Sequence, residues 1–388
     1  MNNIEKDVLD LLWLISCGVH GTPVDAQRIK GVNEENVHAL AVKHGVEQVI
    51  AFVLVQAWKE CGETQKAQAW ERIIRHGMRR TLYFDIEREE ILAYFEENGI
   101  WYMPLKGVVL KDLYPKDSMR QMTDNDILYD AKYRDKVLAF FEARGYRVER
   151  NEKGADDAAY KMPMYNFEMH KTLFIEYSDL YPYYADVRKR LISDGQSRFG
   201  LRFTDEDFYV YMVAHAAKHY RLSGHGLRFL LDIFIYLQKM EEKMDWVYIS
   251  QELSKLKVAG YESVAKAICL KLFSAEGFTQ IDSLTPAEKE MLSFVVQSSL
   301  FGNMKGYVHQ HLSDIQSTGE TSLGKAKLIY IVRRLFPNTN EMVFRYPVLE
   351  HKQWLLPVYY VRRIVSATLL SSGRYAREFM QTIRAGKK

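Results

Sequence analysis

Apolar residues recur at helical spacing through the first part of the chain. They fall three and four positions apart over residues 8–15, again from Val37 to Trp58, and again from Gln65 to Asn98. This spacing places them along one face of an α-helix. Residue types with catalytic chemistry do not occur at useful spacing there, so residues 1–98 are predicted to form a helical scaffold region.

Short apolar runs replace the helical pattern after residue 98. The run Ile100–Leu105 predicts a strand, Val108–Tyr114 has helical spacing that Pro115 stops, and Asp126–Tyr129 predicts a second strand. We then expect a helix over Lys132–Gly145, a short strand over Tyr146–Arg150, and a polar loop over Asn151–Ala158. Met164–Ser178 is expected to hold one or two strands, over Tyr165–Lys171 and Leu173–Tyr177. Residues 99–190 are therefore predicted to hold a small mixed sheet with helices.

The remainder of the chain, residues 191–388, has helical spacing again. Asp205–Lys239 is the strongest stretch, with Thr204 as its N-cap and with Gly224 and Gly226 dividing it into two helices. Further helices are expected over 246–257, 261–275, 285–300, 305–317, 322–335 and 352–384. The predicted fold class is α+β, in which a small mixed β-sheet core is flanked by mainly helical N- and C-terminal regions.

Charge is unevenly distributed along the chain. The formal net charge is only +3, but the segment from Gly324 to the end has 13 Lys/Arg against 3 Asp/Glu. A basic segment favours polyanions such as nucleic acid or nucleotide phosphates. The alternative is that this Tyr-rich helical region packs on the acidic remainder of the chain, and charge alone does not decide between the two.

Cysteine usage and hydropathy bear on the compartment. The three cysteines, Cys17, Cys61 and Cys269, are far apart and odd in number, which predicts no disulfide framework and favours a reducing cytoplasm. The longest candidate membrane stretch, Trp354–Leu370, is interrupted by Pro357 and by a pair of arginines. We therefore expect no membrane span.

Two carboxylates introduce the second predicted strand. Asp124 and Asp126 are two positions apart, so their side chains share a face of an extended chain. Converging carboxylate oxygens suit Mg²⁺, a hard cation that keeps substrate phosphates as further ligands. Asp-x-Asp is also common in solvated turns, so the spacing leaves both interpretations open.

Lys106-Gly107 lies where the first predicted strand meets a helix. Glycine at that point removes a side chain that would block a phosphate, and Lys106 adds a positive charge. The alternative is an ordinary turn at the end of a strand. In the metal-site interpretation, this pair and the two aspartates would serve phosphoryl or nucleotidyl transfer.

The same segment resembles a known family. Leu105-Lys106-Gly107, Tyr114-Pro115, Arg120 and Asp124-Asn125-Asp126 are similar to motifs of the uncharacterised nucleotidyltransferase family, which belongs to the polymerase-beta-like superfamily. Weaker similarities follow at Glu168-Met169-His170, His215, Arg228, Asp232, Phe336-Pro337 and Tyr359–Arg363. Asn125 departs from the superfamily pattern, which has an apolar strand residue at this position.

The resemblance implies a set of site residues. Asp124, Asp126 and Glu168 would be the catalytic carboxylates and would hold Mg²⁺ or Mn²⁺, with Glu176 as the second choice for the third carboxylate. The nucleotide would bind at Lys106, Gly107 and Arg120. Candidates for the substrate pocket are His170, His215, His219, Arg228 and Asp232, although Arg228 and Asp232 could simply pair along a helix.

The implied function is metal-dependent transfer of an NMP from an NTP to a hydroxyl acceptor, with release of pyrophosphate. The acceptor stays open between a protein, an RNA, a sugar and a small molecule. The alternative is a non-catalytic protein that senses a nucleotide or binds a partner with a degenerate nucleotidyltransferase cleft. A third hypothesis is RNA binding through the basic C-terminal region, which would weaken steeply with salt.

Overall fold

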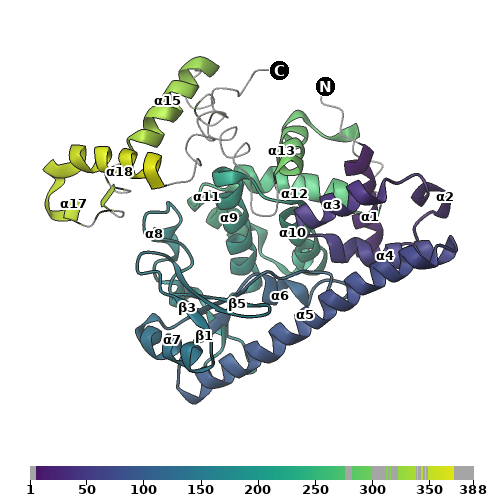
Figure 1. Ribbon diagram of the computed structural model, residues 1–388, viewed down its shortest axis with the longest axis horizontal. Coiled ribbons are helices and arrows are strands. Elements are labelled where there is room, and N and C mark those ends of the chain that lie inside the picture. The colour runs from purple at the N-terminus through teal and green to yellow at the C-terminus, as the bar shows by residue number, and fades with distance from the viewer. Residues whose placement is uncertain are drawn as a thin grey trace. The chain divides into compact units, whose positions relative to one another are not determined.

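The computed structural model describes residues 6–275, 282–298, 312, 315, 322–337, 339, 342–343, 346 and 348–370 (Figure 1). The chain divides into two compact units. The first unit comprises Met1–Ala217 and Gly226–Val296, and the second comprises Lys218–His225 and Gln297–Lys388. All of the elements of the predicted sheet lie in the first unit.

Helices form the N-terminal part of the first unit, as predicted. They are α1 (Lys6–His20), α2 (Ala26–Ile29), α3 (Glu34–His44), α4 (Glu47–Glu60) and α5 (Thr64–Glu97). The prediction of one continuous stretch from Val37 to Trp58 was wrong, because Gly45 takes a left-handed conformation (φ 68°) that ends α3. Glycine adopts that conformation without the steric cost that other residues carry, so it commonly terminates helices.

A five-stranded mixed sheet follows α5. Its strands are β1 (Tyr102–Pro104), β2 (Asn125–Tyr129), β3 (Arg147–Glu149), β4 (Asp156–Lys161) and β5 (Tyr165–His170), in the spatial order β1-β2-β5-β4-β3. Strands β2 and β5 are parallel, and the other neighbours are antiparallel. The intervening helices are α6 (Gly107–Lys111), η1 (Ala131–Tyr133) and α7 (Arg134–Ala143). The α+β prediction is confirmed.

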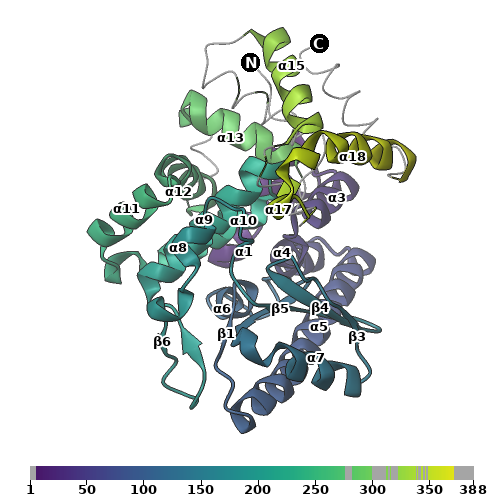
Figure 2. The same cartoon turned by 90° about the vertical axis from the view of Figure 1, so that its left-hand side faces the viewer.

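One face of this sheet is covered by α5 and α7 (Figures 1 and 2). Apolar side chains that alternate along β2 and β5 pack there on aromatic and aliphatic residues of the two helices. This core cluster includes Ile127, Tyr129, Phe167 and Met169 from the strands, Phe84, Ile91 and Phe95 from α5, and Val137 and Phe141 from α7. Because side chains alternate between the faces of a strand, the intervening positions of β2 and β5 point to the other face.

Two boundaries within the α/β part differ from the prediction. The loop expected over Asn151–Ala158 in fact contains the start of β4 at Asp156. The strand expected over Leu173–Tyr177 is irregular, although Leu173 and Phe174 are buried. An apolar run marks burial, and a buried run need not be a strand.

Asp157, a buried residue of β4, connects this strand to Arg134 at the start of α7. Its carboxylate is fully buried and receives two hydrogen bonds from Arg134 at 2.8 Å and one from the backbone amide of Asn151 at 2.7 Å. Burial by itself raises the pKa of Asp157, but these hydrogen bonds outweigh it and bring the pKa below its ordinary value. Asp157 therefore joins the start of α7 to the strand beside β5.

Asp157→Asn is expected to lower the free energy of unfolding by about 2–4 kcal/mol, because Arg134 loses a buried partner. A lowered folded-state pKa gives stability that is complete above the unfolded value of about 3.9 and is lost as the pH falls through the folded value. Urea unfolding should therefore show a difference that shrinks below about pH 4. A pH-independent difference would contradict this assignment. The control is Asp135→Asn, a carboxylate whose side chain is 90% exposed.

Mainly helical elements follow the sheet along the chain, and all of them lie in the first unit except the end of α9 from Lys218 and the last residue of α13. The elements are α8 (Tyr181–Tyr184), η2 (Val187–Arg190), β6 (Ile192–Ser193), β7 (Leu201–Arg202), α9 (Asp205–Ser223), α10 (Leu227–Met240), η3 (Glu241–Lys243), α11 (Trp246–Lys255), α12 (Ala259–Phe273) and α13 (Pro286–Gln297). The Thr204 hydroxyl caps α9 by accepting from the amide of Asp207 at 3.1 Å. The predicted break between α9 and α10 at Gly224 is confirmed.

The described part of the second unit is helical. It contains α15 (Leu323–Leu335), α17 (Val348–His351), η5 (Gln353–Leu355) and α18 (Leu356–Leu370), with a small core formed by Leu312, Ile315, Ala326 and Tyr330. Apart from two positions, the helix expected over 305–317 lies outside the described residues, as does the end of the one expected over 352–384. None of the described helices is long and apolar enough to span a membrane.

Candidate active site

The register between β2 and β5 brings the predicted carboxylates together. Asp126 is directly opposite Glu168, and His170 is two positions further along β5 on the same face. Asp124 immediately precedes β2 and, at a spacing of two, belongs to that face as well. The face is the one that α5 and α7 leave uncovered, since the strand residues that pack on these helices, Ile127, Tyr129, Phe167 and Met169, occupy the other.

Asp126 is the centre of this group. One of its oxygens, Oδ1, accepts from the Lys106 ammonium at 2.9 Å and lies 2.9 Å from His170 Nε2. The same His170 nitrogen lies 3.7 Å from a carboxylate oxygen of Glu168. Potential ligand atoms of Asp126, Glu168 and His170 all lie within 4.8 Å of one another. The exposed side chain of Glu176, the second choice, is not part of this group.

Burial and neighbouring charges shift the protonation of the group. Burial favours the neutral form of Asp126, but Lys106 and His170 outweigh it and hold the pKa of Asp126 well below its usual range. Burial would also lower the pKa of His170, yet the two carboxylates raise it to about 9. His170 is therefore an imidazolium cation at neutral pH in this arrangement, and it donates to Asp126.

The pKa values of the other two carboxylates, Asp124 and Glu168, shift in the opposite direction to that of Asp126. Burial, followed by the charge of Asp126, raises the pKa of Asp124. The nearby His170 favours the ionised form of Glu168, but burial and the charges of Asp126 and Asp124 outweigh it and raise the pKa of Glu168. Three carboxylates so close together repel one another, and a bound cation would relieve that repulsion.

Lys106 reaches Asp126 from a strained backbone. It has φ 42° and ψ −105°, outside the regions that non-glycine residues commonly occupy. Strain of this kind costs on the order of 1–3 kcal/mol and persists where the surrounding structure holds it, often at functional sites. The adjacent Leu105 amide donates to the Asp126 carbonyl at 3.0 Å, which fixes the turn against β2.

The space beside Gly107 is taken by Arg120. A Cβ added to Gly107 would lie 2.7 Å from an Arg120 guanidinium nitrogen and 3.2 Å from the Met122 side chain. We expected the absence of a side chain at Gly107 to leave room for a phosphate, but in the structure this space admits the Arg120 guanidinium. The close approach of Arg120 to α6 is what requires glycine here.

Arg120 forms a buried ion pair with Asp232. Two guanidinium nitrogens donate to the two carboxylate oxygens at 3.0 and 2.9 Å, and the Tyr114 hydroxyl donates to the same carboxylate at 2.8 Å. The third nitrogen of Arg120 donates to the Gln121 carbonyl. The pairing expected between Asp232 and Arg228 along the helix is therefore replaced by a contact between distant segments. A nucleotide contact for Arg120 stays a prediction.

Arg228 lies beside this ion pair and is also buried. It donates to the Gln121 carbonyl at 3.0 Å, while its Nε has no hydrogen-bond partner among the described residues. Burial, followed by the charge of Arg120, lowers the pKa of Arg228 to about 10. Both arginines act on the carboxylate of Asp124, whose pKa they lower. Arg228 is therefore a buried cation with a donor to spare next to the carboxylates.

Asn125, the departure from the superfamily pattern, has a partner on α5. Its side chain is fully buried on the core face of β2, and its carbonyl oxygen accepts from Arg88 at 3.2 Å. About two turns before Arg88 on the same helix, Arg80 donates to the carbonyls of Met122 and Thr123 at 3.0 and 3.2 Å. Helix α5 thus holds the segment that leads into the two aspartates.

Tyr211 is a member of the site that the sequence did not reveal. It comes from α9, is almost fully buried, and interacts electrostatically with Lys106, Asp126 and Glu168. Its hydroxyl has no hydrogen-bond partner within the described part of the chain. As one of 25 tyrosines, and on a segment far from the strands, it carries no distinguishing signal in the sequence.

The two α9 histidines differ in placement. The ring of His215 stacks on Phe229 with 6.1 Å between centroids, and it lies 6.1 Å from the ring of Tyr211. His219 is one turn further along and belongs to the segment Lys218–His225 of the second unit. Their roles in a substrate pocket stay predictions.

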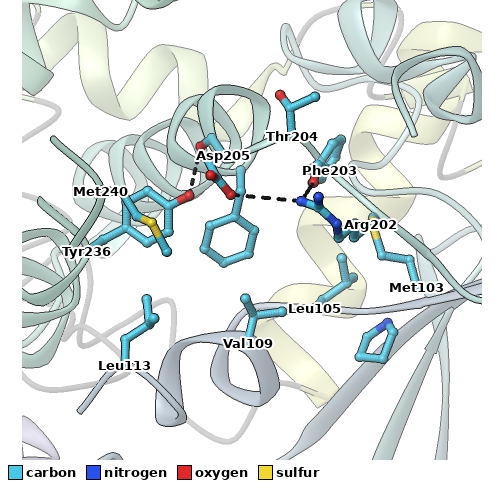
Figure 3. A pocket seen from close by; sticks show the side chains of 12 residues that line it. Met103, Leu105, Val109, Leu113, Arg202, Phe203, Thr204, Asp205, Tyr236 and Met240 are labelled. Atoms are coloured by element: carbon cyan, nitrogen blue, oxygen red, sulfur yellow. Dashed lines mark hydrogen bonds and ion pairs between the residues drawn. The ribbon is translucent and has the colours of Figure 1, made fainter. Parts of the chain in front are cut away.

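A small cavity of about 100 Å³ lies beside the outer strand of the sheet (Figure 3). Apolar side chains including Met103, Leu105, Val109 and Phe208 line it, and Arg202 and Asp205 lie at its edge. None of the predicted site residues lines this cavity. It is therefore separate from the carboxylate group.

Comparison with known proteins agrees with this geometry. A family model described as uncharacterised nucleotidyltransferase matches residues 30–273, which include the whole sheet and α9 and α10. No curated protein and no solved structure matches the chain. With well over half of its length covered by that match, the chain belongs to the uncharacterised nucleotidyltransferase family.

Proposed function

We propose that the protein transfers an NMP group from an NTP to a hydroxyl acceptor, with release of pyrophosphate, in a reaction that depends on a divalent metal. The observation that carries the proposal is the register of β2 and β5. It aligns Asp126 with Glu168 on one face and leaves Asp124 at the entrance of the same strand. Family membership supports the general reaction, and the arrangement of carboxylates supports the metal dependence.

The donor set fits a hard divalent cation. Ligand oxygens of Asp126 and Glu168 lie within 4.8 Å of each other, and burial together with repulsion among the three carboxylates raises the pKa values of Asp124 and Glu168. Mg²⁺ or Mn²⁺ would be held by Asp126 and Glu168, with Asp124 as the third carboxylate. When bound, such an ion neutralises charge on the phosphates and on the attacking oxygen.

The residues of the chain then supply positioning and charge. We assign the partly buried Lys106 and the buried Arg228 to the triphosphate, and the Nε of Arg228 has no hydrogen-bond partner within the described residues. Each nitrogen of Arg120 donates to a protein partner, so we assign Arg120 to hold the loop that carries Gln121 against α10, and a nucleotide contact for it stays a prediction. His170 stays protonated, donates a hydrogen bond to Asp126 and thereby orients that carboxylate.

No classical general base is required of these residues. Nucleotidyl transfer relies chiefly on alignment and on stabilisation of developing charge. The attacking hydroxyl bonds to the alpha-phosphorus, the bond to the bridging oxygen breaks, and pyrophosphate carries the electron pair away. The proton of the hydroxyl passes to the carboxylate group or to solvent.

The direct test uses ATP, GTP, CTP and UTP labelled at the alpha-phosphate, with Mg²⁺ or Mn²⁺ and with EDTA as the metal-free control. Label is followed into the protein itself, cell protein, RNA and small-molecule fractions. Metal-dependent incorporation into one fraction would support the proposal and identify the acceptor class. No incorporation from any nucleotide in any fraction would overturn it.

Nucleotide sensing without turnover is the second candidate, and one observation favours it. Lys106 and His170 already neutralise Asp126, so a nucleotide could bind without an ion. Equilibrium binding of an NTP that is unchanged by EDTA, together with no transfer, would select this function. Nucleic-acid binding through the basic C-terminal region stays a prediction, because much of that region lies outside the described residues.

Tyr211→Phe is expected to reduce nucleotidyl transfer by roughly 5–50-fold. The substitution removes the buried hydroxyl beside Lys106 and Asp126, so the substrate or a bound water would lose a hydrogen-bond partner there. The protein should keep its stability, since that hydroxyl has no protein partner among the described residues. The measurement is the rate of label incorporation alongside thermal unfolding. Tyr184→Phe is the matched control, because it removes another buried hydroxyl from the ring cluster around Tyr211. Equal losses in both variants would contradict a specific role.

A further inference from the structure

Helix α5 has a second apolar face that the described residues of the first unit leave exposed. Met78, Leu82 and Ile86 are at least half exposed, at 55%, 56% and 50%, and Tyr83 is 40% exposed. Met78, Leu82 and Ile86 are spaced by four along a helix of 34 residues, so these three form one stripe. Single exposed apolar side chains are normal, but a contiguous stripe marks an interaction surface.

The stripe lies opposite the face that α5 buries against the sheet. Phe84, Ile91 and Phe95 define the buried face. At about 100° of rotation per residue, Leu82 lies roughly 160–200° around the helix from Phe84 and Ile91. The exposed stripe therefore cannot turn inward without removing these aromatic residues from the core. It is a permanent feature of the surface rather than a loosely packed part of the core.

Charge along α5 changes sign at the stripe. From Thr64 to Thr81 the helix has five Lys/Arg and one Glu, whereas from Leu82 to Glu97 it has one Arg and six Asp/Glu. One half of the helix is therefore basic and the other acidic, with the apolar residues at the junction. Two such helices that pack antiparallel place basic halves against acidic halves, which is a self-complementary arrangement.

The residue positions agree with a two-fold axis at Leu82. Positions equally far before and after the axis meet in an antiparallel pair, so Leu82 meets its own copy. Four positions away on either side, Met78 meets Ile86 of the partner subunit. Seven positions away, Arg75 meets Glu89 of the partner subunit. All five lie on one side of the helix, since spacings of three and four residues keep them in register.

The charged residues at this surface are accessible. The Arg75 side chain is 62% exposed and has only a long contact of 3.6 Å with Glu71. Glu89 is exposed and forms no ion pair within the described ranges. Within the described part of the chain, an intermolecular pair would at most replace the long Arg75–Glu71 contact, and exposed ion pairs of this kind contribute little.

We propose that the protein forms a symmetric dimer through α5, with two antiparallel α5 helices in contact along Arg75–Glu89 and the two-fold axis at Leu82. The occupant of the exposed stripe is thus a second copy of this chain. A few half-exposed apolar residues per subunit make a small interface, so the dissociation constant is expected on the order of 10 µM. This assembly is independent of nucleotidyl transfer.

Sedimentation equilibrium of the full chain between about 1 and 200 µM tests the dimer. The wild type should show a monomer–dimer equilibrium that weakens as salt is raised. Leu82→Arg puts two like charges on the axis and is expected to raise the dissociation constant at least about 10-fold. A wild type that stays monomeric over the whole range would overturn the proposal.

A charge exchange tests the register itself. Arg75→Glu and Glu89→Arg, each alone, should weaken the dimer by about 3–10-fold, because each places like charges together. The double variant Arg75→Glu/Glu89→Arg should return to within about 3-fold of wild type. Lys136→Glu, an exposed reversal on α7, should have no effect. A double variant as weak as the singles would refute the antiparallel register.

Thermal unfolding of each variant shows whether the substitution has disrupted the fold. The unfolding temperature is expected to change little, because all of these side chains are exposed.

The competing occupant of the stripe is a membrane surface. A monomeric wild type that co-sediments with phosphatidylcholine–phosphatidylserine vesicles, and a Leu82→Arg variant that does not, would assign the stripe to lipid and refute the dimer.

Discussion

Asp126→Asn is expected to reduce nucleotidyl transfer by roughly 10³-fold or more. Asp126 lies at the centre of the site, with Lys106 and His170 on the same oxygen and Glu168 directly opposite. An amide removes the negative charge that these cations and a divalent ion would share. The measurement is incorporation of alpha-labelled nucleotide under saturating metal and NTP.

Glu149→Gln is the matched control for that experiment. It makes the same chemical change on β3, at the opposite edge of the sheet, where the Glu149 side chain is 53% exposed. It should leave the rate within about 2-fold of wild type. If Asp126→Asn retained a tenth or more of the wild-type rate, the carboxylate group would not be the catalytic centre.

Glu168→Gln separates chemistry from stability. Asp126 is buried between two cations, so its replacement also risks the fold, whereas the Glu168 side chain is 32% exposed. We expect Glu168→Gln to lower the rate by about 10²-fold or more while thermal unfolding stays near that of wild type. A stable protein with full activity would remove Glu168 from the mechanism.

Asp232→Asn is expected to lower the free energy of unfolding by about 3–5 kcal/mol. Its carboxylate is the partner of Arg120 and Tyr114, and it also offsets the charge of Arg228. These groups are buried, and a buried cation that loses its partner is costly because it cannot return to water. Urea denaturation of the wild type and the variant measures the difference.

Glu242→Gln is the control for the Asp232 prediction, since it lies exposed just beyond the end of α10. It should change the free energy of unfolding by less than about 0.5 kcal/mol. The double variant Arg120→Met/Asp232→Leu should be more stable than Asp232→Asn, because it removes the uncompensated charge of Arg120. A single variant within about 1 kcal/mol of wild type would show that the ion pair does not stabilise the fold.

Much of the local structure could be predicted from the sequence because its causes are local. The spacing of apolar residues determined the helices, and Gly224 and Thr204 marked real helix ends. The shared face of Asp124 and Asp126 followed from strand alternation alone. Gly45 is likewise a local signal for a helix end, and it divides the predicted stretch Val37–Trp58 into two helices.

Contacts across the fold were decided only by the tertiary structure. Lys106 and Asp126 meet because β1 and β2 are neighbours, and Glu168 faces Asp126 because β5 pairs with β2 in one register. A shift of one residue would turn Glu168 toward the core, and the sequence of a single strand does not specify which register forms. Tyr211 reaches the same place from a helix far along the chain.

Local patterns in the sequence thus predicted most of the helices and strands and which side chains share a face, since these depend on neighbours a few residues away. The partner of each buried charge depends instead on how distant segments pack. Arg120 and Asp232 are 112 positions apart and pair at 3.0 Å, a contact that exists only because the three-dimensional fold brings both groups together, where each offsets the charge of the other out of water.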